Sequence, residues 1–120
     1  MAIELINKTG KIHIENDVIG TVAGIAAMEV FGLVGMASRK QLKDGIAELL
    51  KKENLSKGIE VRTEDEEVII DMYIIVSYGT RISEVAHNVQ QKVIYTLENT
   101  IGVKVSKVNV IVQGVRVSQV

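Results

Sequence analysis

The chain has 120 residues, no cysteine, no proline and a formal net charge of −1 at pH 7. Its length fits a single domain spanning residues 1–120, and its near-zero charge gives no global attraction to nucleic acid or anionic lipid. The lack of cysteine excludes disulfides, thiolate catalysis and cysteine-ligated metal sites. Hydrophobic residues make up 47% of the chain and aromatic residues only 3%, so we expect a core of Val, Ile, Leu and Ala.

The first third of the chain predicts a strand, a helix and a second strand. Residues 11–15 alternate between polar and apolar side chains, as in a half-buried strand. Asn16 or Asp17 is expected to cap a helix that ends before Gly32. The short apolar segment 33–37 then predicts a buried strand.

Residues 18–37 also have the length and low charge of a membrane span, since Glu29 is their only charge. Two glycines near the end, Gly32 and Gly35, break the helical pattern, and Glu29 in hydrocarbon would cost roughly 2.5 kcal/mol or more. We therefore favour a buried helix followed by a strand. The N-terminal residues lack the basic region and long apolar run of a secretory signal, which predicts a cytoplasmic protein.

The middle of the chain predicts a helix and the start of a hairpin. Ser38 is expected to cap an amphipathic helix over about residues 39–53. A strand follows from Gly58. The acidic run at residues 64–67 is expected to be a solvated turn and not a metal site, because it lacks the alternating ligands of a calcium loop.

The second half predicts strand, glycine turn, helix and strand. Residues 68–78 form the longest strand pattern, with Tyr73 and Ile75 on its mixed and exposed face. Gly79 permits a sharp turn, and Thr80 or Ser83 is expected to cap a helix over residues 82–101.

The last strand changes phase twice. Its valines are first odd-numbered, at Val103 and Val105. They are then even-numbered, at Val108, Val110 and Val112, and odd-numbered again at Val115 and Val117. Each change implies an extra residue or kink, one near residues 106–107 and one near Gly114. Together these elements predict an α+β, two-layer sandwich in the order β-α-β-α-β-β-α-β. Its sheet would be mainly antiparallel with about four to five strands, covered by two long helices and a shorter one.

Residues that carry chemistry are few. His13 and His87 are expected to be solvated, and no spacing of histidines predicts a metal site. Glu29 and Asp71 are charges in apolar stretches. This leaves open either a catalytic carboxylate pair, or a Glu29 that reaches a helix end or a lysine together with an Asp71 on an exposed sheet face. No catalytic residue, cofactor or metal is predicted.

One alternative concerns nucleic acid. Gly32 and Gly35 have the spacing of a Gly-x-x-Gly loop that clamps phosphates, and a helix beginning with Arg39 and Lys40 follows. The middle residues of this loop are apolar and nearby aromatic side chains are scarce, so nucleic acid is the less favoured partner.

Several segments in a fixed order carry a family resemblance. In the first half they are residues 10–14 (GKIHI), 18–19, 25–26 and 29–36 (EVFGLVGM); in the second half they are residues 71, 76–82 (VSYGTRI), 85–86, 89–90, 93 and 108–112 (VNVIV). Their order resembles the alkaline shock protein family of bacteria, and the length resembles its short members. The resemblance implies a small cytoplasmic α/β domain without known catalysis and with links to alkaline or cell-envelope stress. Some longer relatives self-assemble and reach the membrane through a separate anchor protein.

The sequence therefore favours a non-enzymatic scaffold or adaptor that self-associates, with any membrane contact made through a partner protein. Exposed strand edges and apolar faces are the usual sites of self-association. The residues expected to carry it are Tyr73, Ile75, Val108, Val110, Val112, Val115 and Val117.

Overall fold

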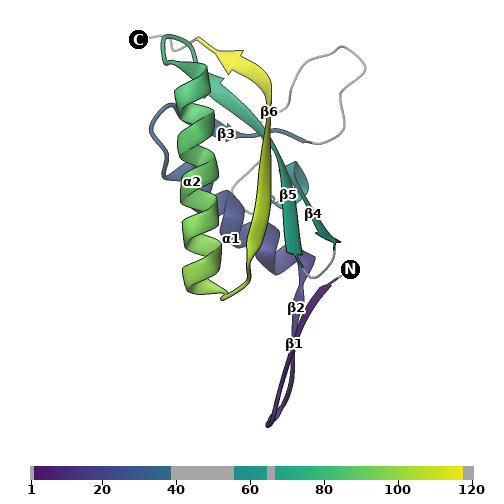
Figure 1. The fold of residues 1–120 in the computed structure, drawn as a ribbon. Coiled ribbons are helices and arrows are strands. Elements are labelled where there is room, and N and C mark those ends of the chain that lie inside the picture. The colour runs from purple at the N-terminus through teal and green to yellow at the C-terminus, as the bar shows by residue number, and fades with distance from the viewer. Residues whose placement is uncertain (1, 39–55, 65–66, 118–120) are drawn as a thin grey trace.

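The computed structural model describes residues 2–38, 56–64 and 67–117 (Figure 1). The helix expected at about residues 39–53 lies outside these ranges. In chain order, the elements are β1 (Ala2–Asn7), β2 (Gly10–Glu15), α1 (Asn16–Met28), β3 (Leu33–Met36), β4 (Ile59–Glu64), β5 (Glu67–Ser77), α2 (Ile82–Thr100) and β6 (Val105–Arg116).

The main sheet is built around β5. Strand β6 pairs with it in parallel from Val68 to Ser77, and so occupies one side of β5 along almost its whole length. Strands β3 and β4 pair with β5 antiparallel, and because a strand has only two sides they share the other one. The result is a mixed, mainly antiparallel sheet, which confirms the expected α+β class.

Both helices pack against the same face of this sheet. Alternate β5 residues, from Val68 to Val76, are at most 2% exposed and lie in one cluster with side chains of α1 and α2. The α2 stripe of Val85, Val89, Val93 and Leu97 is buried as its helical spacing predicts. On α1 the contact is made largely by alanine, which lets the helix approach its neighbours closely.

Gly32 and Gly79 adopt backbone angles that side chains rarely allow. Gly79, in the β5–α2 turn, has φ +97° as predicted for a sharp bend, and a Cβ there would meet open space. Gly32 has φ +96°, and a Cβ there would lie 2.7 Å from Cγ2 of Val85. Gly32 therefore allows α2 to pack closely against the segment between α1 and β3, whereas α1 itself ends at Met28 with Glu29 as its C-cap.

The predicted N-caps of α1 and α2 are wrong, while the cap expected at Ser38 belongs to a helix expected outside the described residues. Glu15 and Arg81 occupy the N-cap positions, and neither makes a side-chain cap hydrogen bond. Asn16 instead donates from Nδ2 to the Val61 carbonyl at 3.3 Å, which ties α1 to β4. The hydroxyl of Thr80 donates to the Ser77 carbonyl at 2.7 Å, so it closes the turn and does not cap the helix.

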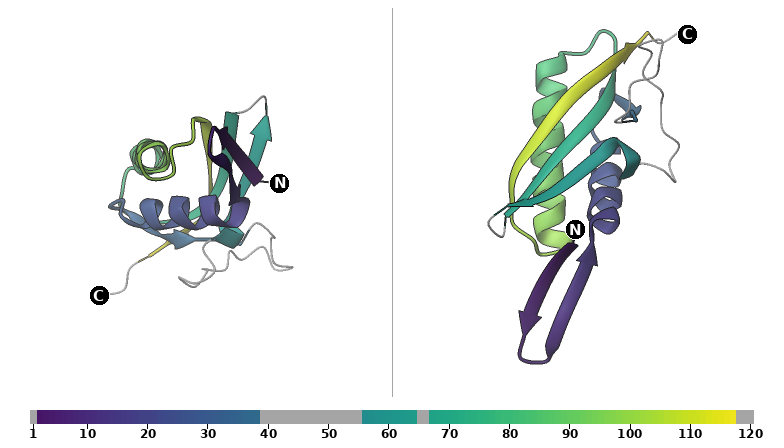
Figure 2. Two further views of the ribbon diagram at one scale, coloured as in Figure 1. Left: turned by 90° about the horizontal axis from the view of Figure 1, so that it is seen from below. Right: turned by 90° about the vertical axis from the view of Figure 1, so that its right-hand side faces the viewer.

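The N-terminal strands form a separate hairpin, here called the arm (residues 2–15). Strand β1 pairs antiparallel with β2 from Ala2↔Glu15 to Asn7↔Gly10, and neither joins the main sheet. The arm projects away from the helices and sheet (Figures 1 and 2). The strand expected at residues 11–15 is confirmed as β2, but its expected half-burial is wrong, because most of its side chains are exposed. Strand β1, which precedes it, was not predicted.

Candidate functional site: two uncovered apolar surfaces

The two phase changes in β6 are bulges that keep its valines on one face. The β5–β6 register shifts at Ser106 and again at Gln113, where β6 carries one residue more than β5. Both shifts lie where the sequence predicts them. As a result, every valine of the strand stands opposite an inward-facing residue of β5: Val105, Val108, Val110, Val112 and Val115 face Val68, Ile70, Met72, Ile74 and Val76.

These five residues, here called the valine stripe, become steadily more exposed toward the end of the strand. Val108 is 4% exposed and packs in the core, whereas Val112 is 36% and Val115 46% exposed. Val117, just beyond the strand, reaches 65%. The apolar stripe is thus longer than the helical layer that covers it, and its last part is an uncovered apolar surface.

The outer edge of β6 is protected only in its first half. Gln90 of α2 donates from Nε2 to the Val108 carbonyl at 2.9 Å, which satisfies one edge group. Beyond Val108, within the described chain, no strand pairs with this edge. Residues 110–116 therefore combine an unpaired backbone edge with exposed valines.

The arm carries the second uncovered surface. Its register places Ile3 opposite Ile14 and Leu5 opposite Ile12, so these four residues share one side, here called the arm face. Ile3 and Ile14 pack against the core near the base of the arm. Farther out, Ile12 is 48% exposed. An isolated two-stranded hairpin is only marginally stable in water, so the outer arm face lacks a covering layer.

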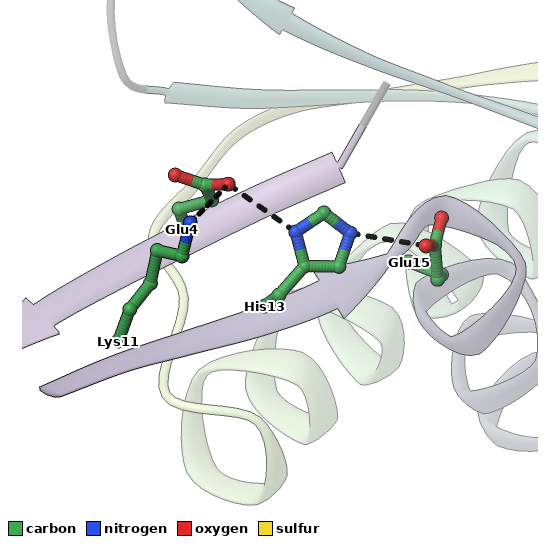
Figure 3. Close-up of polar contacts among 4 residues, drawn as sticks. All are labelled: Glu4, Lys11, His13 and Glu15. Carbon is green, nitrogen blue, oxygen red and sulfur yellow. Dashed lines mark hydrogen bonds and ion pairs between the residues drawn. The ribbon is translucent and has the colours of Figure 1, made fainter.

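The opposite side of the arm is charged (Figure 3). His13 lies between two carboxylates, with Nε2 3.0 Å from Glu15 and Nδ1 3.3 Å from Glu4, while Lys11 Nζ lies 3.6 Å from Glu4. The hydrogen bonds to Glu15 and Glu4 raise the pKa of His13. The hydrogen bond from His13 and the charge of Lys11 lower the pKa of Glu4.

A hollow of about 580 Å³ borders the outer side of β1. Four consecutive β1 residues line it, from Ile3 to Ile6. Because consecutive residues point to opposite faces, the strand's edge, and not one of its faces, borders this space. The facing wall is formed by the ends of the main sheet and the α2–β6 connection, at Thr63, Val68, Gly102, Val103 and Lys104.

The predicted interaction residues divide into two groups. Val112, Val115 and Val117 are exposed, but Val108 is a core residue and Val110 packs partly against the core. Ile75 is 3% exposed and Tyr73 is half-buried. The expectation that Tyr73 and Ile75 form an exposed face is therefore wrong for Ile75, because strand alternation reveals which face a residue is on but not whether that face is covered.

The two carboxylates considered for catalysis lie apart and each has a cation. Asp71 is on the sheet face away from the helices, where Arg62 approaches it to 3.2 Å and the Asn109 amide donates to it at 2.8 Å. Glu29, at the end of α1, lies 3.5 Å from Lys92 of α2. The structure therefore does not bring these groups into one site. Glu29 reaches a lysine, as in the non-catalytic interpretation, whereas the side chain of Asp71 is only 18% exposed and is paired with Arg62.

Gly32 and Gly35 do not form the phosphate-binding loop that was considered as an alternative. Gly35 is buried within β3 and pairs with Ile75, and the Gly32 carbonyl accepts a hydrogen bond from the Ser77 amide at 2.9 Å. Both are occupied by sheet and helix packing and form no open loop. Arg39 and Lys40 lie outside the described residues.

Within residues 2–38, 56–64 and 67–117, the structure offers neither a metal-binding cluster nor a membrane-spanning helix. No group of three His, Asp or Glu residues there is arranged to hold a metal ion, and His87 is exposed on α2. None of the helices found in those ranges has the length and apolar character needed to span a membrane. The segment considered as a span is instead α1 followed by β3, as favoured above.

Sequence reasoning missed the arm and Ile111, which is exposed near the end of β6. The sequence does contain a signal for the arm, because Ile3 and Leu5 alternate with Glu4. In the structure, the residues between the strands form a turn in which Asn7 Oδ1 accepts a hydrogen bond from the Thr9 amide at 2.9 Å. Three of the four aromatic side chains, Phe31, Tyr78 and Tyr95, are also largely exposed.

Comparisons with known proteins agree on one family. The profile of the alkaline shock protein 23 family, described as having a cell envelope-related function, matches residues 4–117. YloU of Bacillus subtilis (strain 168) is 62% identical over 118 residues, covering 98% of each chain. Spy1614 of Streptococcus pyogenes serotype M6 is 44% identical over 117 residues, covering 98% of this chain and 97% of that protein.

Both relatives are described as uncharacterized, so they indicate kinship and not activity. Among solved structures, a variant of MamM CTD is similar with a TM-score of 0.50 and 14% identity, covering 88% of this chain and 100% of that one. At this identity the likeness concerns the fold alone. The family profile and the close relatives together show that the chain belongs to the alkaline shock protein 23 family, whose described function is related to the cell envelope.

Proposed function

We propose that this protein is a non-enzymatic scaffold or adaptor in the cytoplasm that acts through self-association and protein–protein contacts, in the cell-envelope setting of its family. The observation that carries the proposal is the exposure gradient of the valine stripe, from 4% at Val108 to 46% at Val115. A sheet edge that continues its core pattern beyond its own helical layer has the features of an association surface.

The energetic argument favours covering the end of this stripe. Complete burial of one valine side chain stabilises by roughly 1.5–3 kcal/mol relative to exposure. Val112, Val115 and Val117 keep between about a third and two-thirds of their surface in contact with water. A partner that covers all three removes this surface from water and also pairs the backbone groups of the β6 edge.

The arrangement of charged groups supports a role without catalysis. Asp71 and Glu29 are each held by a cation on opposite sides of the sheet, and His13 lies on an exposed hairpin. A general acid or base typically works from a cleft in which its pKa is tuned by burial. Any membrane association would then be made through a partner protein, as in the longer relatives.

Light scattering across a range of concentrations tests the proposal. The wild-type chain is expected to increase in mass with concentration, and Val115→Lys to remain monomeric because it places a charge in the contact. Val18→Lys is the matched control, since Val18 is 50% exposed on α1 and far from β6. A wild-type chain that is monomeric at every concentration and captures no protein from native lysate would overturn the proposal.

A further inference from the structure

The proposed self-association has a specific geometry in this fold. We propose that the arm of one copy adds to the free end of β6 in the next copy, so that copies join head to tail. This inference rests on the proposed function and identifies the second copy as the occupant of both uncovered surfaces. Its elements are β1 (residues 2–7) and the unprotected half of β6 (residues 110–116).

The first argument is the placement of the two surfaces. The arm projects from one end of the molecule, and β6 reaches its last residues at the opposite end (Figures 1 and 2). A contact between two different surfaces of identical chains is heterologous, and in an open assembly it leaves one surface of each kind free at the two ends. Head-to-tail joining therefore produces an open series or a closed ring, whereas a self-complementary contact stops at a dimer.

The second argument is that both surfaces offer a backbone edge. The outer edge of β1 faces the hollow of about 580 Å³, and the edge of β6 has no partner strand beyond Val108 among the described residues. Six residues of β1 match the seven of residues 110–116 in length. Pairing these edges satisfies their backbone N–H and C=O groups, as in the addition of a strand to an exposed sheet edge.

The third argument is the match between the apolar faces. Directly paired residues of neighbouring strands point to the same side of a sheet. The arm face can lie on the same side of the extended sheet as the valine stripe or on the opposite side. In the first arrangement, β1 places Ile3 and Leu5 beside Val112 and Val115, and β2 adds Ile12 to the same layer. A one-residue slip would turn the arm face away, so the apolar pattern selects this alignment.

The fourth argument is charge. Strand β6 carries two cations, Lys107 and Arg116, and no acidic residue, while β1 carries Glu4 and no basic residue. Within residues 2–38, 56–64 and 67–117 no carboxylate forms an ion pair with Arg116. A neighbouring arm brings it the carboxylates of Glu4 and Glu15, which share one side of the arm with Lys11 and His13. Pairing β1 with β1 instead brings like charges together at Glu4, and pairing β6 with β6 leaves the arm face uncovered.

Cysteine cross-linking tests this arrangement cleanly, because the natural chain has no cysteine. Full-length Leu5→Cys and Val115→Cys variants are prepared separately, mixed, and treated with a short bifunctional maleimide. We expect a cross-linked dimer in the mixture and little or none with either variant alone. The double variant Leu5→Cys with Val115→Cys is expected to give a ladder of dimers, trimers and larger species, or a ring of fixed size.

Each alternative outcome has a distinct signature. Strong cross-linking of Val115→Cys alone would show β6 pairing with β6, and that of Leu5→Cys alone would show pairing between arms; either result overturns the head-to-tail inference while leaving self-association intact. Oligomers by light scattering without any of these cross-links overturn it as well. A monomer by light scattering removes this inference, and it removes the proposed function as well if the chain also captures no protein from native lysate. Circular dichroism confirms that each variant is folded before it is scored.

Discussion

At the scale of single residues, His13 makes the arm sensitive to pH. Its hydrogen bonds to Glu15 and Glu4 raise its pKa above the ordinary value of 6.5. The bound proton therefore stabilises the arm fully below about pH 6.5, and this contribution is lost as pH rises through the higher folded-state pKa. For Glu4 the sign is opposite: its lowered pKa contributes stability above its ordinary value of 4.5, which is lost as pH falls.

We predict that an NMR titration of His13 gives a pKa above its ordinary value, and that Glu15→Gln lowers it. The pKa should fall because the carboxylate of Glu15, 3.0 Å from Nε2, favours the protonated form of His13. Amide exchange within the arm should become faster, relative to the main sheet, as His13 loses its proton. An unchanged pKa in Glu15→Gln would show that the contact does not persist in solution.

Gly32 and Gly79 provide a matched pair of positions for substitution by alanine. Both have nearly the same φ, but only at Gly32 does a Cβ meet another side chain. Gly79→Ala should lower the free energy of unfolding by about 1–2 kcal/mol through backbone strain alone. Gly32→Ala should cost about 1–3 kcal/mol more, since it also overpacks Val85. Urea denaturation measures both, and equal losses would contradict the close packing of Gly32 against α2.

At the scale of elements, β6 has two functional halves. Val108→Ala removes a fully packed side chain and should lower the free energy of unfolding by about 2 kcal/mol. Val115→Ala, at an exposed position, should change it by less than about 0.5 kcal/mol while weakening self-association. Denaturation of dilute samples, in which the chain is monomeric, separates the two effects. A larger loss of unfolding free energy for Val115→Ala than for Val108→Ala would contradict the assignment of Val108, and not Val115, to the core.

The sequence predicts the longest elements well, because their patterns extend over many residues. The α2 stripe, the inward face of β5 and both bulges of β6 can be predicted from residue spacing alone. Of the arm, only β2 is predicted; the alternation of β1 extends over few residues, and its identity as a strand depends on pairing with β2. The caps are missed since Glu15 and Arg81 begin their helices without side-chain capping. Burial of Ile75 is missed because it depends on tertiary cover, which a strand pattern does not encode.

At the scale of the whole molecule, the fold leaves an apolar arm carrying the carboxylates of Glu4 and Glu15 at one end and an apolar strand end carrying Arg116 at the other. This polarity predicts that self-association weakens with salt, as screening reduces the attraction between Arg116 and the carboxylates of the arm. Arg116→Glu should weaken self-association in low salt, whereas Lys107→Glu, on the half of β6 that α2 protects, should leave it nearly unchanged. Equal effects of the two substitutions, measured by light scattering, would point to overall charge and not to the β6 end.

The described function of the family relates the proposed assembly to the cell envelope. Copies joined in an open series present many identical helical faces at regular spacing, and multiple sites in one assembly raise the effective affinity for a clustered partner. Exposed Phe31 and Tyr95 lie together beside a shallow hollow between the end of α1 and α2. They would be repeated along such an assembly.

Sedimentation velocity of the unmodified chain over a wide concentration range tests the central claim of self-association most directly. The head-to-tail arrangement predicts an average sedimentation coefficient that rises continuously with concentration, or a ring of fixed size, and a return to monomer in Val115→Lys. A single monomeric species at every concentration would contradict the claim that the uncovered surfaces of the arm and β6 are association surfaces.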